Sequence, residues 1–233
     1  MLNFNNEQQN CHSIRYNNLM IKLFLKILIG ATFLIVFLIP GYTYFIVNKG
    51  DTSLIFNSSI DASSRLYILF RLFGLYGFAL IWGQLVLGPF MNPLRRLFGP
   101  GVFRAHRAEG VFALIFATLH PLIFYTAYTL SANHRQIWFG LSDYFGTSNL
   151  LLFGYLGPLS WTLLVCTVLT AIFNKYIKAW RTIHLLNYLV FIFAFFHSYK
   201  IGTEVFLQPL NTLYLFYGLT FIAAVLYRAS ALS

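Results

Sequence analysis

The sequence predicts an all-α membrane protein, a bundle of six transmembrane helices. Of the 233 residues, 58% are hydrophobic and only 9% are charged, and the mean hydropathy is +0.69. A soluble domain of this size carries about a quarter charged residues, so this chain has too little charge to cover a water-facing surface. Its apolar residues also form runs of about twenty or more, the length that crosses the hydrocarbon core of a bilayer. A soluble enzyme, a disordered chain and a disulfide scaffold are therefore excluded.

The elements follow one another along a single six-helix transmembrane domain, residues 23–228, without a linker or an obvious internal repeat. The segments that we expect to span the membrane are 23–47, 66–90, 104–130, 149–173, 179–200 and 208–227. The first is too long for the apolar region of a signal peptide, so it is expected to stay as a helix. Residues 1–22 form a polar cytoplasmic tail, expected to be disordered, and residues 229–233 form a short tail after the last span.

The basic residues predict the orientation. The net charge is +10. One set of eleven Lys and Arg flanks the spans on one side, at Arg15, Lys22, Lys26, Arg95, Arg96, Arg104, Arg107, Lys175, Lys178, Arg181 and Arg228. By the positive-inside rule both termini are cytoplasmic, in a multi-pass protein of the inner or plasma membrane. Charges that flank spans in this way do not form a face for nucleic acid.

Four of the six histidines lie inside the predicted spans, where an ionisable residue is costly without a partner or a function. His106 and His120 are 14 residues apart, and His184 and His197 are 13 apart. These steps correspond to about 21 Å and about 20 Å along parallel helices. His106 therefore pairs in depth with His184 near the inner side, and His120 with His197 near the outer side. Two facing imidazoles at each depth predict two stacked b-type haems, whereas the alternative for a single histidine is a hydrogen bond between helices.

The angular positions fit this prediction less simply. On an ideal helix, 14 residues place His120 about 40° from His106, whereas 13 residues place His197 about 140° from His184. Over- or underwinding of the helix, a π-bulge, or different azimuths of the two haems must absorb this difference. Pro121 makes the third span a candidate for that distortion.

Small residues lie one helical turn from two of the histidines. Gly110 is one turn after His106, and Ala117 is one turn before His120. Such residues could give a flat macrocycle room against the backbone. Ordinary helix packing favours them equally.

Several arginines are candidates to pair with haem propionates. Arg104, Arg107, Lys178 and Arg181 surround the inner histidine level, although membrane topology explains each of them equally well. Arg71 lies about one and a half turns into the second span, where topology does not require a charge. We expect its partner to be an outer-haem propionate or an anionic substrate, and snorkelling to the headgroups is the alternative.

Two segments carry a family resemblance. RLFGPGVFRAHRAEGVFALIFATLHPLIFY (96–125) and AWRTIHLLNYLVFIFAFFHSYKIG (179–202) resemble the paired haem-ligand helices of the ferric reductase-like transmembrane domain family. That family includes the membrane halves of NADPH oxidases and ferric reductases. The resemblance covers about residues 66–228. It implies six helices and two haems b, with His106 and His184 as inner ligands and His120 and His197 as outer ligands.

The chain also departs from that family. The oxidases and reductases continue into FAD- and NAD(P)H-binding domains, whereas this chain ends at Ser233 and has no G-x-G-x-x-G fingerprint. FAD or FMN and NAD(P)H are therefore expected only through a separate partner. In length the chain is similar to the haem-bearing membrane subunits of the bacterial methionine sulfoxide reductase system (MsrQ, also called YedZ). Those subunits are expected to lack an equivalent of His106, so the subfamily stays open.

Three functions remain as hypotheses. The first is transmembrane electron transfer from a cytoplasmic flavin reductase or the quinone pool to an extracytoplasmic acceptor such as ferric chelate, oxygen or a partner protein. The second is a subunit of a periplasmic protein-repair reductase, with residues 131–148 as its docking surface. The third is a transporter or channel with a histidine proton relay. Against the third, Glu109 lies near the inner boundary, no acidic residue is expected in mid-membrane, and no inverted repeat is visible.

Overall fold

The computed structural model describes residues 3–131 and 148–230, and every regular element in those ranges is helical. The long helices are α1 (Asn3–Tyr42), α3 (Ala62–Leu87), α5 (Gly101–Leu130), α7 (Ser148–Ile172), α9 (Asn187–Ile201) and α10 (Leu210–Ser230). The short elements are a π-helical turn (Thr43–Val47), α2 (Lys49–Ser53), a 3₁₀ turn (Leu54–Phe56), α4 (Met91–Phe98), α8 (Trp180–His184) and a 3₁₀ turn (Glu204–Phe206). The predicted all-α class is confirmed.

Six helical stretches are long and apolar enough to cross a membrane, as predicted. They are Leu19–Val47, Ala62–Leu87, Gly101–Leu130, Leu151–Ile172, Trp180–Ile201 and Leu210–Ser230. The expectation of a disordered tail is wrong, because α1 begins at Asn3 and continues into the first span. The physical reason is that residues 1–22 contain neither proline nor glycine, so nothing terminates the helix ahead of the apolar run.

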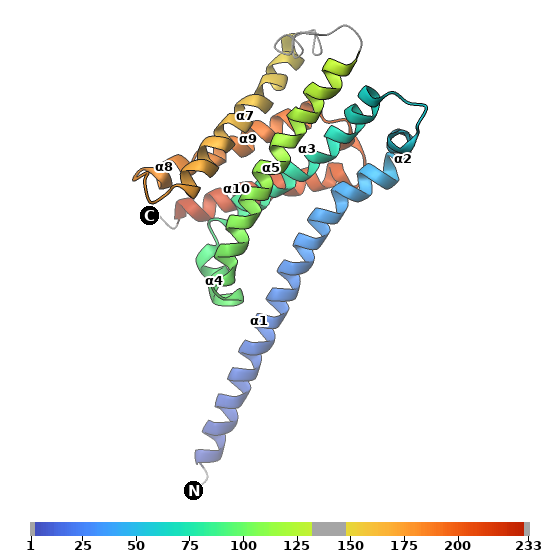
Figure 1. Cartoon of the computed structure of the whole chain (residues 1–233). Helices are drawn as coiled ribbons and strands as arrows, with labels where there is room; N and C mark the ends of the chain where they lie inside the picture. The colour runs from blue at the N-terminus through green and yellow to red at the C-terminus, as the bar shows by residue number, and fades with distance from the viewer. Residues whose placement is uncertain (1–2, 132–147, 231–233) are drawn as a thin grey trace.

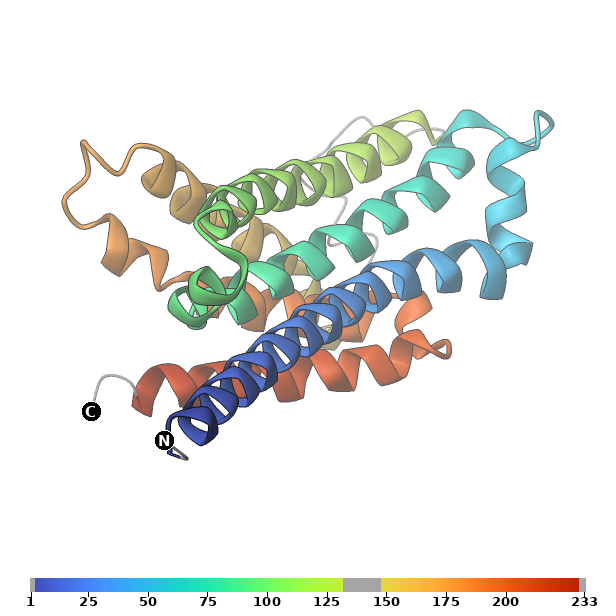
Figure 2. The same cartoon turned by 90° about the horizontal axis from the view of Figure 1, so that it is seen from below.

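The bundle has two distinct ends (Figure 1). The views of Figures 1 and 2 place α4, α8 and the C-terminus at one end and α2 at the other. We call these the inner end and the outer end, after the orientation that the basic residues predict. At the inner end the chain turns from α4 into α5 at Gly99, whose φ of +86° lies in the left-handed region that favours glycine.

Helix α3 is the centre of the packing. It lies along α5 and also contacts α9 and α10, while α7 lies along α9. On α3, Phe78 stacks on Tyr214 of α10 with ring centroids 5.1 Å apart, and on Phe191 of α9 at 5.4 Å. The buried Trp82 donates a hydrogen bond from Nε1 to Thr220 Oγ1 of α10 at 2.8 Å. Since α3 contacts both α5 and α9, it holds the two histidine-bearing helices relative to each other.

The predicted fifth span is not a single helix. It breaks between α8, which ends at His184, and α9, which begins at Asn187. In the break, backbone N–H groups bond three residues back, at Leu185, Leu186 and Tyr188. Since each 3₁₀ residue turns the chain by about 120° and not 100°, three or four of them reduce the angle between His184 and His197 from about 140° to about 60–80°. The distortion lies here, whereas α5 runs unbroken through Pro121.

Candidate functional site

The outer pair of histidines comes together between α5 and α9. The ring centroids of His120 and His197 are 6.3 Å apart, and the ring planes are inclined at 82°. A metal–imidazole bond is about 2 Å long and the ring centre lies about 1 Å behind the nitrogen, so imidazoles on opposite sides of one metal have centres about 6 Å apart. The observed separation fits that arrangement.

Each ring of this pair is held by a backbone carbonyl of the preceding long helix, α3 for His120 and α7 for His197. His120 Nδ1 lies 2.9 Å from the carbonyl oxygen of Phe70 on α3, and His197 Nδ1 lies 2.9 Å from that of Phe153 on α7. Because a carbonyl can only accept, each Nδ1 carries the hydrogen and donates it. Each Nε2 then keeps its lone pair, which is the tautomer that metal binding requires.

A glycine four residues further along makes each of these contacts possible. A Cβ at Gly74 would lie 2.7 Å from His120 Nδ1, and a Cβ at Gly157 would lie 2.6 Å from His197 Cε1. Any other residue would therefore displace the imidazole. The same Phe-x-x-x-Gly spacing thus precedes each histidine helix, at 70–74 and at 153–157. This local repeat was visible in the sequence, and the sequence analysis missed it.

The inner pair has a different environment. His106 lies in the second turn of α5, and His184 ends α8. In the structure, Asn187 Nδ2 lies 3.1 Å from His184 Nδ1, and Asn187 Oδ1 accepts from the hydroxyl of Thr167, a buried residue of α7, at 2.7 Å. A metal at Nε2 requires a hydrogen on Nδ1, so the Asn187 amide must then present its oxygen to His184 and its nitrogen to Thr167.

His106 Nδ1 is buried and has no hydrogen-bond partner among the described residues. Its backbone carbonyl is fixed, because Gln84 Nε2 of α3 donates to it at 2.6 Å and also to Glu109 Oε2 at 2.9 Å. A Cβ at Gly83 would overlap the Glu109 carboxylate, so that glycine leaves room for the carboxylate against α3. The inner imidazole of α5 is thus positioned through its backbone.

The predicted small residues serve helix packing. A Cβ at Gly110 would meet Gln84 Oε1 at 3.1 Å, so that glycine accommodates the side chain of α3. A Cβ at Gly77 would lie 3.2 Å from the backbone nitrogen of Ala117, so this glycine lets α3 and α5 approach closely. Packing, the alternative explanation, accounts for both contacts.

Arg71 has a protein partner that the sequence analysis missed. Its Nη1 lies 3.1 Å from Glu204 Oε1 and donates to Thr203 Oγ1 at 3.0 Å. The Glu204 side chain is only 2% exposed and also accepts from Asn48 Nδ2 at 3.2 Å. The charge of Arg71 is therefore balanced within the protein, and its role toward a propionate stays a prediction. Glu204 could have been suspected as the one acidic residue of the predicted loop 201–207.

The basic residues of the inner level are solvent-facing. Arg104, Arg107, Lys178 and Arg181 are all exposed. The Arg181 guanidinium lies 5.4 Å from the centre of the Trp180 ring, which is itself 6.2 Å from the His184 ring. Their pairing with propionates stays a prediction. The predicted docking loop 131–148 lies outside the described residues except at its two ends.

The donor set suits one kind of metal group. Within residues 3–131 and 148–230, no cluster of three or more His, Cys, Asp or Glu could hold an ion. Two histidines cannot complete a tetrahedral zinc site. Two axial imidazoles are, however, what a haem iron takes, since the macrocycle supplies its other ligands. The outer histidines, with their two carbonyl contacts and two glycine contacts, therefore fit a haem, and the inner histidines offer the same donor type. No family model, curated protein or solved structure matches the chain.

Proposed function

We propose that this protein transfers electrons across a membrane through two haems b. His106 and His184 would hold the inner haem, and His120 and His197 the outer one. One observation carries the proposal: the outer imidazoles lie 6.3 Å apart, and each donates its Nδ1 hydrogen to a backbone carbonyl at 2.9 Å. A histidine that only forms a hydrogen bond between helices does not require a second imidazole facing it, nor the same kind of carbonyl partner on both rings.

The chain's own residues bind, orient and insulate. When bound, the two haems supply two one-electron sites at different depths of the membrane. Histidines on both sides of each site leave no open position for substrate. The carbonyls of Phe70 and Phe153 fix the outer rings and raise their basicity, which tunes the bound group. The surrounding apolar helices exclude water.

The electron donor is proposed to be a separate cytoplasmic flavin reductase, carrying FAD or FMN and using NAD(P)H, or the quinone pool. The exposed arginines of the inner end support this, because a basic surface favours association with an acidic partner. The acceptor is proposed to be a ferric chelate, oxygen or a periplasmic reductase at the outer end. The six spans indicate a multi-pass membrane protein, and we propose the inner or plasma membrane as its location.

An absorption spectrum tests the proposal. Protein purified in detergent from haem-replete cells should show b-type bands that sharpen on reduction with dithionite. Pyridine haemochrome analysis should give about two haems per chain, as two bis-histidine sites require. Reconstituted vesicles with dithionite outside should then reduce ferricyanide trapped inside. A colourless protein would overturn the proposal.

A further inference from the structure

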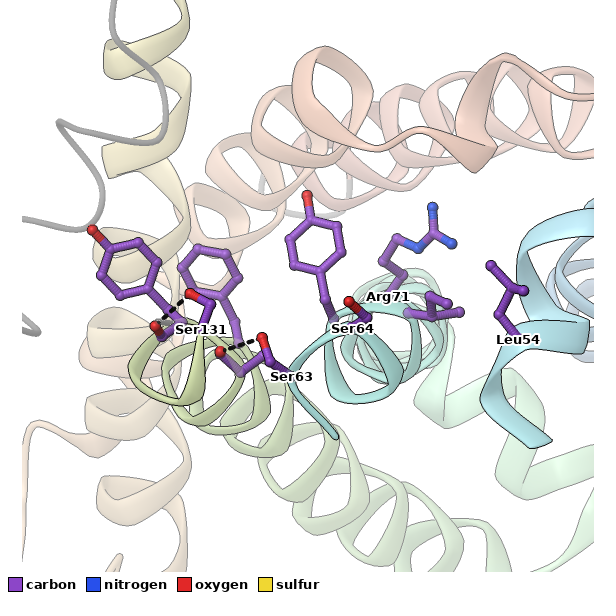
Figure 3. A pocket seen from close by; sticks show the side chains of 10 residues that line it. Leu54, Ser63, Ser64, Arg71 and Ser131 are labelled. Carbon is purple, nitrogen blue, oxygen red and sulfur yellow. Dashed lines mark hydrogen bonds between the residues drawn. The ribbon is translucent and has the colours of Figure 1, made fainter. Parts of the chain in front are cut away.

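A cavity of about 440 Å³ lies at the outer end, between α3 and α5 (Figure 3). Small-molecule sites have volumes of about 300–1,000 Å³. The sequence analysis assigned nothing to this place. We call it the outer pocket. The residues that carry its chemistry are Ser63, Ser64 and Arg71 of α3 and Phe124, Tyr128 and Ser131 of α5.

The outer pocket is electrically balanced. Arg71 is the one charged residue among the described residues that line it. Its guanidinium is 3.1 Å from the buried carboxylate of Glu204, and the two side chains are only 11% and 2% exposed. An anion would therefore meet a cation that is already neutralised, and it would lose its hydration on entry. The pocket favours a neutral ligand.

The serine hydroxyls that line the outer pocket already donate their hydrogens to other groups of the protein. Ser63 Oγ donates to the carbonyl of Ala127, and Ser131 Oγ donates to that of Tyr128, each at 2.8 Å. Ser64 Oγ donates to the carboxylate of Asp61, also at 2.8 Å. A hydroxyl oxygen that has donated its hydrogen keeps its lone pairs. The serine oxygens thus offer acceptors to which a ligand with hydroxyl groups can donate.

Aromatic side chains form its wall and connect it to the outer histidines. The rings of Phe124 and Tyr128 line it with centroids 6.4 Å apart and planes inclined at only 23°, so they border the pocket with nearly parallel aromatic rings. Phe124 contacts Phe70 at 5.2 Å between ring centroids, and Phe70 contacts His120 at 5.0 Å. A ring that contacts Phe124 would be separated from His120 by two aromatic side chains, Phe124 and Phe70.

We propose that the outer pocket binds a neutral aromatic ring that carries hydroxyl groups, a ligand of the phenol or hydroquinone class. The ring stacks against the aromatic wall, and its hydroxyls donate to the serine oxygens. The proposed binding depends only on the residues of the outer pocket. That the bound ligand could exchange electrons with the outer pair rests on the proposed function.

Binding is measured with three probes on the full-length protein in lipid nanodiscs, with empty nanodiscs subtracted. The first is 4-hexylresorcinol, a dihydroxybenzene that cannot be oxidised to a quinone. The second is its dimethyl ether, which has the same ring and tail but no hydroxyl donors. The third is 4-hexylbenzenesulfonate, which is anionic. We expect saturable binding of the resorcinol and binding at least about tenfold weaker for the other two. Equal binding of the ether, or tightest binding of the sulfonate, would overturn the proposal.

Two variants locate the site. Ser64→Phe fills the pocket from an exposed position on the first turns of α3, and Ala62→Phe places the same side chain two residues earlier, where it does not line the pocket. Resorcinol affinity should fall about tenfold or more in the first and stay unchanged in the second. Equal affinity in both variants would place the ligand elsewhere.

Haem content measured on the same preparations separates this proposal from the proposed function. A colourless protein that binds the resorcinol would contradict only the haem proposal. A protein that holds two haems and does not bind the resorcinol would contradict only the pocket proposal.

Discussion

The outer and inner histidine pairs share residue type and helix order but differ in what holds their rings. At the outer pair, backbone carbonyls of two preceding helices accept from both Nδ1 atoms. At the inner pair, His184 meets the side-chain amide of Asn187, and His106 Nδ1 has no partner within the described part of the chain. A carbonyl in a helix cannot rotate, whereas an amide side chain can. The outer site is therefore preorganised by the fold, and the inner site is adjustable.

This difference has a consequence for ligand binding. Preorganised ligands lose less conformational freedom when a group binds between them. We therefore expect the outer haem to be held more tightly, and mild chaotropes to release the inner haem first. The following substitutions test the comparison.

The largest effect should follow removal of a ligand. His120→Ala should reduce the haem content from about two to about one per chain, because only the inner pair remains complete. His184→Ala should remove the other haem. Pyridine haemochrome analysis and reduced spectra of both variants check this, with His12→Ala as the control. Loss of both haems in His120→Ala would contradict the pairing by depth.

A second large effect concerns the ion pair at the outer end. Glu204→Gln and Arg71→Met should each destabilise the fold by about 3–5 kcal/mol, because either change leaves a buried charge unpaired. The double variant should recover most of that loss. Thermal unfolding in detergent measures the cycle. If Arg71 instead serves a propionate, Arg71→Met alone would lower the outer haem content while Glu204→Gln would not.

The glycine contacts should affect the outer pair only. Gly74→Ala or Gly157→Ala places a Cβ within 2.7 Å of an imidazole, so the ring must shift away from its carbonyl. Loss of such a supporting contact lowers affinity by about 10–100-fold. Gly30→Ala is the matched control, since nothing lies within 4 Å of a Cβ there. Competition of the bound haem with apomyoglobin measures affinity, and a faster loss from the inner site would contradict the assignment.

A smaller effect should appear at the inner pair. Asn187→Ala removes the side-chain amide that contacts His184 Nδ1, but water or a rotated ring can replace it, so we expect a loss of about tenfold in inner-haem affinity. The outer haem should keep its spectrum and affinity. A change at the outer haem of equal size would show that the two pairs are not independent.

The smallest effect concerns the start of α3. Asp61 accepts from the backbone N–H of Ser64 at 2.7 Å and from its hydroxyl, and these bonds lower the pKa of the carboxyl. Folding therefore favours the ionised carboxylate of Asp61. Its contribution to the stability of the fold is complete above the ordinary carboxyl pKa and is lost as the pH falls through the lowered pKa. Asp61→Asn should keep a cap without that pH dependence. Thermal unfolding at neutral and acidic pH compares the two, and a wild type that gains stability on acidification relative to the variant would contradict this prediction.

The six spans could be predicted because they depend on composition, and the spacing of the histidines along their helices predicted that His120 lies beside His197. The break between His184 and Asn187 could not, because leucines occupy it and no proline or glycine marks it. For Gly110 and Ala117 the sequence left a macrocycle and helix packing as equal explanations, since a helix sequence does not tell which neighbour its small residues face; in the structure both lie where α3 packs against α5.

Hydrophobicity, the order of the charges and the histidine spacing act locally or through the bilayer. The sequence by itself therefore determined the membrane class, the number of spans and the four candidate ligands. The partners of those ligands come from residues far along the chain. Phe70 lies 50 residues before His120, Phe153 lies 44 before His197, and Glu204 lies more than 130 after Arg71. Such contacts exist only after helices pack, because packing chooses which backbone carbonyl and which carboxylate come within reach of each buried side chain.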